Sequence, residues 1–425
     1  MNYSETLEKI HSLNRFGIKP GLERISALME NLGNPQDKLK FIHIAGTNGK
    51  GSTAAMLSNI CIAAGKKTGL FISPFVVNFR ERIQVNGEYI EENSLCNLVE
   101  RVIPAAETVY KSIGDTVTEF EFITATAFLY FAEKNCDIVV LETGLGGRLD
   151  STNIIKTPLL SVITKIDLDH TAVLGSTVSE IAAEKCGIIK ANSAVVTPST
   201  QNEQALKVIR RAANEKGAKF ILADKNYAED IINEPFGNYV TYKGIKLFTQ
   251  KPGAHQVENM TVAAQAAIFL GINEKHITRG IENTSFPARL EVISKNPLVL
   301  LDGAHNDNGA AALSEYLIDN NIRPIVILGM MKDKDCSSVI KKICSYAKFV
   351  ITVTVKSNPR AESAENLLNL AKKYCENCVT ASSYDKALEI AFKKSGEENA
   401  PVLVCGSLYL ASDIRPKLIN MYKQH

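Results

Sequence analysis

Short apolar runs alternate with longer stretches of helical periodicity along most of the chain. Phe41–Ala45 is a mainly apolar run, and the periodic stretch Thr53–Ala64 follows it. Apolar runs recur at Asp137–Glu142 and Leu159–Thr164. Buried parallel strands give runs of this length, and the helices that connect them give the periodic stretches. The pattern therefore predicts βαβ units and an α/β domain with a mostly parallel sheet and helices on both faces.

Two local signals add detail to this first series. Thr177 has Glu180 three residues further on, which is a capping box, and we expect a helix that runs through Lys185 towards Ile189. Asn86-Gly87 lies between two short alternating stretches and predicts a hairpin turn.

A second alternating series begins near residue 290 and predicts a smaller, Rossmann-like α/β domain. We therefore expect a domain of residues 1–286 and another of residues 287–425, joined near Ser285-Phe286-Pro287, because proline is common at element boundaries. The second series has predicted helices at Gly309–Ile318 and Ala364–Lys373, and predicted strands at Leu298–Asp302, Pro324–Leu328, Phe349–Val353 and Val402–Cys405.

Composition narrows the class of protein. The chain has 425 residues and a net charge of +2, which does not support binding to nucleic acid or to a membrane surface. No apolar run approaches the length of a membrane helix, and the first ten residues lack a signal-peptide core, so we expect a cytoplasmic protein. Nine cysteines without framework spacing suit reduced thiols. Cys375 and Cys378 form one CxxC pair, but no further zinc ligands lie nearby in the sequence.

The run Gly46-Thr47-Asn48-Gly49-Lys50-Gly51-Ser52 follows a predicted strand and opens a predicted helix, which is the context of a phosphate-binding loop. Glycines let backbone N–H groups point inward, and the helix N-terminus favours negative charge. Lys50 can reach the β- and γ-phosphates, and Ser52 can bind Mg²⁺. The loop is two residues shorter than the usual GxxxxGK[ST] pattern, so a surface turn is the alternative.

Candidate metal ligands follow two predicted strands. Glu142 ends one apolar run, and His170 lies just beyond the next. Ligands bind at the carboxyl edge of open parallel sheets, and Mg²⁺ prefers oxygen donors. The alternatives are a solvated strand end for Glu142 and a structural hydrogen bond for His170.

Three further residues are candidates for the site, and two of them also have a structural interpretation. Lys185 lies among apolar neighbours, which lowers the pKa of a lysine and makes it nucleophilic, although Lys185 by itself would be interpreted as a surface lysine with a buried stem. Asp302 follows a predicted strand and could instead be a helix cap. Arg289, at the predicted join, could reach a phosphate bound by the first domain.

These residues lie within eight ordered segments that resemble the folylpolyglutamate synthase/dihydrofolate synthase family of the Mur-ligase superfamily. The segments are GTNGKGS at 46–52, ETGLGGRLDSTN at 142–153, LDHT at 168–171, EKCGIIK at 184–190, PGAHQVEN at 252–259, PARL at 287–290, DGAHN at 302–306 and GMMKDKD at 329–335.

The resemblance implies an ATP-dependent ligase that joins L-glutamate to a folate, with ATP, folate and L-glutamate as its small-molecule partners, and it implies a monomer. It places ATP on Thr47, Asn48, Gly49, Lys50, Gly51, Ser52, Asn259, Arg289 and Asp302. It makes Ser73, Glu142 and His170 ligands of Mg²⁺, with two ions expected, and Lys185 a carbamate. It assigns the pteroate part of the substrate to Thr118, Glu119, Phe120, Glu121, Leu149, Asp150 and Ser151.

Three departures from the family pattern affect the folate side. Phe75 stands where the family has histidine, Lys19 in Ile18-Lys19-Pro20 stands where bifunctional members often have an acid, and Glu119 stands where an aromatic residue is frequent. The ATP-binding segments do not depart in this way. The sequence therefore predicts ATP-driven ligation and leaves open whether the chain adds the first glutamate, the later ones or both.

The chemical hypothesis is an acyl phosphate. A folate carboxylate attacks the γ-phosphoryl group of ATP, with Lys50, Arg289 and Mg²⁺ neutralising charge. The amine of glutamate then displaces phosphate, and His305 is the candidate for accepting its proton. Alternatives are a related ligase on another carboxylate, a nucleotide-gated binding protein and a kinase.

Overall fold

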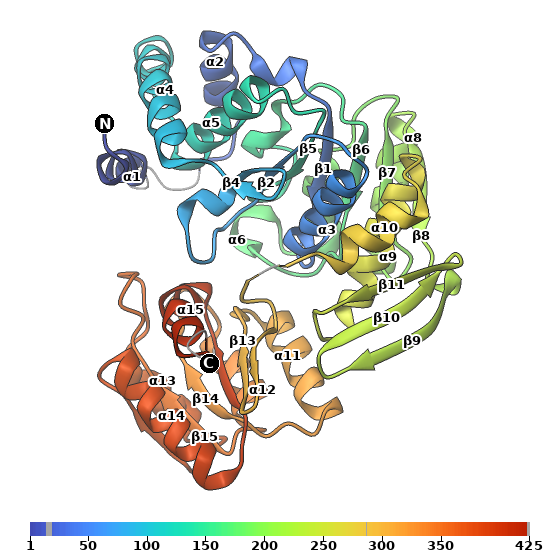
Figure 1. Cartoon of the computed structure of the whole chain (residues 1–425). Coiled ribbons are helices and arrows are strands. Elements are labelled where there is room, and N and C mark those ends of the chain that lie inside the picture. Colours follow the sequence, from blue (N-terminus) through green and yellow to red (C-terminus); the bar gives the residue numbers. More distant parts are fainter. Residues whose placement is uncertain (14–18, 286, 423–425) are drawn as a thin grey trace.

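The computed structural model describes residues 1–13, 19–285 and 287–422, so Ile18 and Phe286 of the segments above lie outside the described residues. Two α/β lobes follow one another along the chain (Figure 1), as the alternation predicted. None of the described helices is long and apolar enough to cross a membrane. All nine cysteines are free thiols.

The first lobe is built on an eight-stranded sheet in the order β4-β3-β2-β5-β1-β6-β7-β8. Six strands are parallel, and the β3–β4 hairpin adds two antiparallel strands at one edge. The strands are β1 (Phe41–Ala45), β2 (Thr68–Phe71), β3 (Ile83–Val85), β4 (Glu88–Tyr89), β5 (Ile138–Glu142), β6 (Leu160–Ile163), β7 (Ala194–Pro198) and β8 (Lys219–Ala223).

Helices cover both faces of this sheet because successive strand residues point to opposite sides. Ile42 and Val140 pack with α3, α9 and α10, whereas Phe41 and Val139 pack with α2, α4 and α5. The helices are α1 (Tyr3–His11), α2 (Glu23–Asn31), α3 (Lys50–Ala63), α4 (Glu92–Ile113), α5 (Glu119–Glu133), α6 (Thr171–Leu174), α7 (Val178–Cys186), α8 (Glu203–Glu215), α9 (His255–Phe269) and α10 (Glu274–Glu282). Short 3₁₀ helices are η2 (Pro35–Lys38), η3 (Phe79–Arg82), η4 (Ser151–Ile154) and η5 (Lys225–Tyr227).

A small antiparallel sheet that the sequence did not predict extends from the first lobe. It has the order β11-β10-β9 and lies beside the second lobe's α11 in Figure 1. Its strands are β9 (Ala228–Glu234), β10 (Gly237–Tyr242) and β11 (Ile245–Thr249). Its inner residues, such as Tyr242, join the core beneath α9.

The second lobe is a six-stranded sheet in the order β12-β13-β17-β14-β15-β16, parallel except for the edge strand β12. Its strands are β12 (Glu291–Lys295), β13 (Leu298–Leu301), β14 (Ile325–Leu328), β15 (Phe349–Thr352), β16 (Cys378–Thr380) and β17 (Val402–Cys405). Its helices are α11 (Asp307–Asp319), α12 (Cys336–Cys344), α13 (Ala364–Ala371), α14 (Tyr384–Glu398) and α15 (Leu408–Tyr422). This confirms the predicted smaller Rossmann-like unit.

Two predicted helix bounds were wrong for identifiable reasons. Helix α3 begins at Lys50 rather than Thr53, because Gly49 in a left-handed conformation (φ 83°) starts the helix inside the phosphate loop. Helix α7 has the predicted Thr177 cap but ends at Cys186. Gly187 lies so close to Arg148 that a Cβ would come within 2.3 Å of the Arg148 Cα, and its carbonyl accepts a hydrogen bond from Asn153.

Candidate active site

The carboxyl ends of three adjacent strands bring the predicted site residues of the first lobe together. In the sheet register Ile44 on β1 pairs with Glu142 on β5, and Ala45 pairs with Ile163 on β6. The phosphate loop, Glu142 and the loop that carries His170 therefore leave the same edge side by side. Ligands bind at this edge of open α/β sheets.

Two glycines set the shape of the phosphate loop. A Cβ on Gly46 would lie 1.8 Å from the Thr164 hydroxyl, and a Cβ on Gly49 would lie 2.3 Å from the Asn259 side-chain oxygen. Both glycines have positive φ angles, which only glycine adopts without strain. The same contact places Asn259, from α9, against the loop.

Backbone hydrogen bonds divide the loop into two parts. The N–H groups of Thr47 and Asn48 donate to the Lys165 carbonyl at 2.8 and 3.2 Å, and the Thr47 hydroxyl bonds Asp167. These two residues therefore fasten the loop to the segment after β6. No described residue accepts a hydrogen bond from the N–H groups of Gly49 to Ser52, which leaves these four donors for an anion.

Lys50 and Lys185 converge on one carbonyl oxygen. Both ammonium groups donate to the Gly46 oxygen, at 3.0 and 2.8 Å, and Lys50 also reaches the Thr47 oxygen at 3.3 Å. Burial, followed by the nearby Lys50 charge, lowers the pKa of Lys185 to about 7. Lys185 is 4% exposed, so the interpretation as a surface lysine was wrong.

Glu142 is a buried carboxylate, 3% exposed, with a single hydrogen bond, from the Ser73 N–H at 3.1 Å. Burial raises its pKa to about 6, while Lys50, the Ser73 N–H and Arg289 oppose that rise. A solvated strand end is therefore excluded, and the charge of Lys50 acts on this carboxylate.

His170 lies at the mouth of the site, in a left-handed conformation (φ 49°) at the start of α6. Its Nε2 atom is 3.7 Å from the Asp169 carboxylate. Burial lowers the pKa of His170, Asp169 opposes this effect, and the charges of Lys334, Lys50 and Lys185 add to it. A neutral imidazole offers a lone pair to a metal.

The donor atoms of Glu142 and His170 fit Mg²⁺. Within residues 1–13, 19–285 and 287–422, no group of three or more His, Cys, Asp or Glu side chains is arranged to hold a metal by itself. Mg²⁺ does not need such a group, because it takes one or two protein oxygens and completes its shell with water and phosphate oxygens. A buried carboxylate with one hydrogen bond, beside four free N–H donors, suits a metal that arrives with a nucleotide.

The second lobe contributes residues from the ends of β13 and β14. The Asp302 carboxylate accepts hydrogen bonds from Leu290 N–H at 2.6 Å and Ala304 N–H at 2.7 Å. The helix cap of α11 is Asn306, so the interpretation of Asp302 as that cap was wrong. Burial raises the pKa of Asp302 and the charge of Arg289 lowers it.

His305 lies three residues further on, before α11 begins, and its Nδ1 contacts the Gly303 carbonyl at 2.8 Å. Nδ1 therefore carries the proton, and Nε2 is left as an acceptor. Burial lowers the pKa of His305 to about 4, and Lys334, Arg289 and Asp169 also act on it. Asp169 belongs to the first lobe, so the two lobes face one another at the site.

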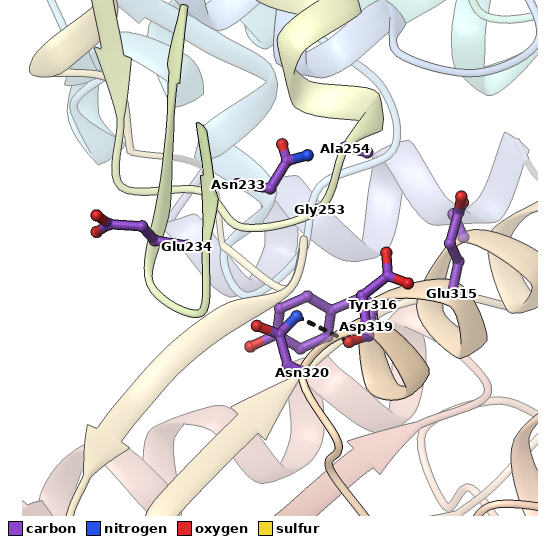
Figure 2. Close-up of a pocket in the computed structure, with 9 residues that line it drawn as sticks. Asn233, Glu234, Gly253, Ala254, Glu315, Tyr316, Asp319 and Asn320 are labelled. Atoms are coloured by element: carbon purple, nitrogen blue, oxygen red, sulfur yellow. Dashed lines mark hydrogen bonds between the residues drawn. The ribbon is translucent and has the colours of Figure 1, made fainter. Parts of the chain in front are cut away.

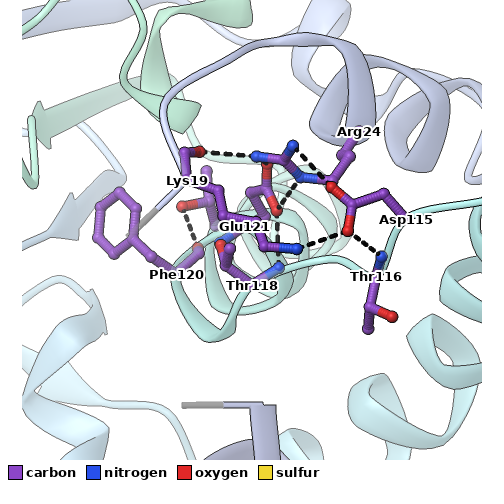
Figure 3. Close-up of polar contacts among 8 residues, drawn as sticks. Lys19, Arg24, Asp115, Thr116, Thr118, Phe120 and Glu121 are labelled. Carbon is purple, nitrogen blue, oxygen red and sulfur yellow. Dashed lines mark hydrogen bonds and ion pairs between the residues drawn. The ribbon is translucent and has the colours of Figure 1, made fainter. Parts of the chain in front are cut away.

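The predicted folate side contains a network of charged residues at the N-terminus of α5 (Figure 3). Arg24 binds the buried Glu121 carboxylate at 3.1 Å and Asp115 at 3.2 Å, and Lys19 binds Asp115 at 2.5 Å. Glu121 also accepts the Thr118 N–H, which completes the helix cap. Two cations and two acids are thus paired with one another.

The remaining predicted folate residues differ in how fully they are engaged. Asp150 is buried and accepts hydrogen bonds from Leu145 N–H, Thr152 N–H and the Thr152 hydroxyl, so its carboxylate holds the glycine-rich loop. The Leu149 carbonyl accepts a hydrogen bond from Gly21, and Ser151 is buried.

Glu119 and Phe120 are less engaged in polar contacts. The Glu119 side chain is 12% exposed, and its polar partner among the described residues is the His11 ring at 3.4 Å. Phe120 packs over Gly144, where a Cβ would come within 2.6 Å of its ring. Glu119 is therefore the carboxylate of this region that is freest to meet a ligand.

Sequence reasoning assigned no role to several residues that the fold brings to the site. The charge of Lys334, within the GMMKDKD segment, lowers the pKa of His305 in its own lobe and of His170 in the first lobe. Arg24 and Asp115 complete the charged network. The quoted GMMKDKD segment was a signal for Lys334, whereas nothing in the local sequence marks the other two.

The lobes also meet away from these residues. The Tyr316 hydroxyl on α11 donates to the Pro235 carbonyl at 2.8 Å, between β9 and β10. Figure 2 shows the small pocket beside this contact, which residues of both lobes line, including Gly253, Glu315 and Asp319. This hydrogen bond ties the small antiparallel sheet to the second lobe.

Comparisons with known proteins match the whole arrangement. The Mur ligase middle domain matches residues 44–267, and the Mur ligase glutamate ligase domain matches residues 288–408. A Bacillus subtilis protein named dihydrofolate synthase/folylpolyglutamate synthase is 39% identical, over 98% of this chain and 99% of its own length. The chain belongs to the folylpolyglutamate synthase/dihydrofolate synthase family of Mur ligases.

Other members of this family agree in sequence and in fold. The folylpolyglutamate synthase of Lacticaseibacillus casei is 35% identical over 99% of each chain. The structure of Mycobacterium tuberculosis folylpolyglutamate synthase complexed with ADP and AMPPCP has a TM-score of 0.89 at 28% identity, and covers 98% of this chain and 99% of that one. A folylpolyglutamate synthase complex with AMPPCP and folate has a TM-score of 0.84 at 33% identity, and covers 99% and 100% of the two chains.

Proposed function

We propose that this chain is an ATP-dependent ligase that adds L-glutamate to folates through an acyl phosphate. The observation that carries the proposal is that Lys50 and Lys185 converge on the Gly46 carbonyl oxygen of a loop whose Gly49 to Ser52 N–H groups are free, while the buried Glu142 ends the neighbouring strand at the same edge of the sheet. Membership of the family supports it, since its relatives are named folylpolyglutamate and dihydrofolate synthases.

In the first step a folate carboxylate oxygen attacks the γ-phosphorus of ATP, and the bond to ADP breaks. The N–H groups of Gly49 to Ser52 and the Lys50 ammonium hold the phosphates, and Arg289 approaches from the join between the lobes. Ser73, Glu142 and His170 would hold Mg²⁺, which supplies neutralising charge to the phosphate oxygens when bound.

In the second step the amine of L-glutamate attacks the acyl carbon, and inorganic phosphate leaves. The amine must lose a proton. The Nε2 atom of His305 is our candidate acceptor, because the Nδ1 atom donates to the Gly303 carbonyl and Nε2 keeps a free lone pair. The reaction consumes ATP, a folate and glutamate, and yields ADP, phosphate and the amide.

We further propose that Lys185 becomes a carbamate. A lysine with a pKa of about 7 is largely neutral slightly above that pH, and only a neutral amine adds to CO₂. A bond forms between Nζ and the carbon of CO₂, and a proton is released. The new carboxylate would face Lys50 and could bind a second Mg²⁺.

Catalysis on this proposal needs both lobes of one chain. The phosphate loop lies in the first lobe, and Asp302, His305 and Lys334 lie in the second. Closure of the lobes would exclude the water that hydrolyses an acyl phosphate. A monomer contains all of these residues.

The test is a nucleotide assay with purified protein, Mg²⁺, L-glutamate and either tetrahydrofolate or dihydropteroate. We expect ADP and phosphate to appear in equal amounts only when both an acceptor and glutamate are present, with a product heavier by one glutamyl residue. Release of ADP without any need for glutamate would indicate a nucleotide-gated binding protein instead. A phosphorylated final product would indicate a kinase.

A further inference from the structure

The segment between β2 and β3 connects the two lobes at the site. Val76 and Val77 belong to the first lobe by sequence but pack in the apolar cluster of the second, with residues such as Leu408. The Glu81 carboxylate accepts the N–H groups of Val76, Val77 and Asn78 at 2.7 to 2.9 Å. These bonds give the segment a fixed conformation, and η3 ends it at Arg82.

Arg82 is a cation without a polar partner. Its guanidinium lies over the rings of Phe75 and Phe79, at 5.2 and 5.7 Å from their centroids. No side-chain hydrogen bond or ion pair joins it to any described residue, and its Nε atom is buried without a partner. Arg82 as a whole is partly exposed, but a cation with a buried N–H group and no acceptor is costly, so it indicates a position where a ligand supplies the counter-charge.

Arg80, two residues earlier, provides a contrast. Its Nε atom is also buried without a partner, but its guanidinium is 3.4 Å from the Glu92 carboxylate and donates to the Ile90 carbonyl at 3.2 Å. The same short helix therefore carries one arginine with structural partners and one without. The local backbone does not explain the difference, because both residues belong to η3.

The charges around Arg82 locate it within the site. Burial lowers its pKa, and the carboxylates of Glu119 and Glu142 and the phenol of Tyr409 oppose that effect. Glu119 lies at the proposed folate end, Glu142 at the metal end, and Tyr409 on α15 of the second lobe. Arg82 therefore lies between the two ends of the acceptor site, beside the cleft.

We propose that Arg82 binds the α-carboxylate of the glutamyl group that ends the folate acceptor, and so directs the γ-carboxylate to the phosphate loop. This inference rests on the proposed function. An acceptor that reaches from Glu119 to Glu142 places its reacting carboxylate at the metal end. From this γ-carboxylate towards the pterin end of the acceptor, the next anionic group is the α-carboxylate. A guanidinium binds a carboxylate with two parallel hydrogen bonds.

Other anions of the reaction have other partners. The phosphates of ATP meet Lys50, Arg289 and the free N–H groups of the phosphate loop. The incoming glutamate approaches the acyl carbon from the side of His305 and Lys334, in the second lobe. Arg82 lies on the first lobe, against the aromatic rings of Phe75 and Phe79, which is the side of the acceptor.

The test compares two acceptors that differ only at the position in question: tetrahydrofolate and its α-carboxamide, which keeps the γ-carboxylate. We expect the natural protein to prefer the carboxylate by roughly 10- to 100-fold in kcat/KM, the usual effect of hydrogen bonds to a charged group. R82M keeps the apolar contact with the rings and should bring the ratio close to one, by lowering kcat/KM for tetrahydrofolate alone. R80M, the matched control, should keep the natural ratio.

Three results would overturn the inference. One is an equal loss of kcat/KM for both acceptors in R82M, which would indicate that Arg82 only supports the segment. Another is an unchanged ratio with a raised KM for L-glutamate, which would assign the guanidinium to the incoming amino acid. The third is a natural protein that turns over both acceptors equally well. Failure of the proposed function is distinct, since the natural protein would then ligate neither acceptor.

Discussion

The polar groups at the candidate site are paired to different extents in the two lobes. In the first lobe, Glu142 and Lys185 are buried with one hydrogen bond each, and four N–H groups of the phosphate loop have no acceptor. In the second lobe, both oxygens of Asp302 and the Nδ1 atom of His305 already have backbone partners. The first lobe therefore holds charge that a ligand must balance, whereas the second holds groups in fixed orientations.

We therefore expect mutations in the two lobes to have different effects on activity and stability. Substitutions in the first lobe should remove charge that acts on the reaction and should leave the fold intact or make it more stable. Substitutions in the second lobe, or at its contact with the first, should change how well the site is assembled. The following predictions test this difference, from the largest expected effect to the smallest.

Replacing Lys50 should have the largest effect. Its ammonium bonds only carbonyls of the loop itself, so Lys50→Ala should lower kcat by about 10³-fold through lost charge stabilisation of the transferring phosphoryl group. Steady-state ADP release measures the loss, and thermal unfolding checks the fold. Lys66→Ala, at an exposed position after α3, is the control and should behave as the natural protein. Normal turnover by Lys50→Ala would remove the phosphate-loop assignment.

Replacing Glu142 should separate activity from stability. Glu142→Gln should lower kcat by about 10²-fold, because an amide is a poorer ligand for Mg²⁺ than a carboxylate. The pKa of Glu142 is about 6, above its usual value of 4.5, so this carboxyl favours the folded state at low pH, and that contribution disappears as the pH rises through 6.

The nucleotide-free variant should consequently be more stable than the natural protein by ~2 kcal/mol at pH 8. At pH 4 the two proteins should have equal stability, because the natural carboxyl is then protonated in both the folded and the unfolded state. Denaturant unfolding at both pH values measures the difference. A less stable variant at pH 8 would show that the carboxylate is balanced by protein groups rather than by a ligand.

The effect of carbon dioxide on activity should be greatest near neutral pH. Because the pKa of Lys185 is lowered to about 7, the neutral amine becomes the main form as the pH rises through 7. Activity after removal of CO₂ should therefore be low, and added bicarbonate should restore it roughly tenfold at pH 7.5 and much less at pH 6. A ¹³C NMR carbamate signal from labelled bicarbonate, absent in Lys185→Met, is the direct measurement. Activity that ignores bicarbonate at every pH would contradict the carbamate.

The contact between Tyr316 and Pro235 should have the smallest effect. Tyr316→Phe removes one hydrogen bond between the lobes, worth about 1 kcal/mol, and leaves the ring in place. We expect KM values to rise a few-fold with kcat little changed, because only the placement of the second lobe is altered. Tyr346→Phe, on an exposed turn after α12, is the matched control. A large fall in kcat would mean that this contact belongs to the reaction site.

Features that depend on neighbours in the chain could be predicted from the sequence. The alternating pattern predicted both sheets, and the Thr177 cap and the Asn86-Gly87 turn were correct because each rests on contacts within a few residues. The phosphate loop could be recognised for the same reason: strand, glycines, lysine and helix are consecutive. Glu142 and the loop that carries His170 could be assigned to one edge of the sheet, because parallel strands end at a common edge.

Features that depend on distant segments required the tertiary structure. The sequence could not show that Thr47 and Asn48 bond the Lys165 carbonyl, nor that Lys185 shares an oxygen with Lys50. It could not distinguish Arg82 from Arg80 either. Burial, pairing and pKa are set by which groups surround a side chain, and here those groups come from segments far apart in the sequence. The sequence alone determined which chemical groups are available, and the packing of the two lobes decided which of them are left without a partner and can bind a ligand.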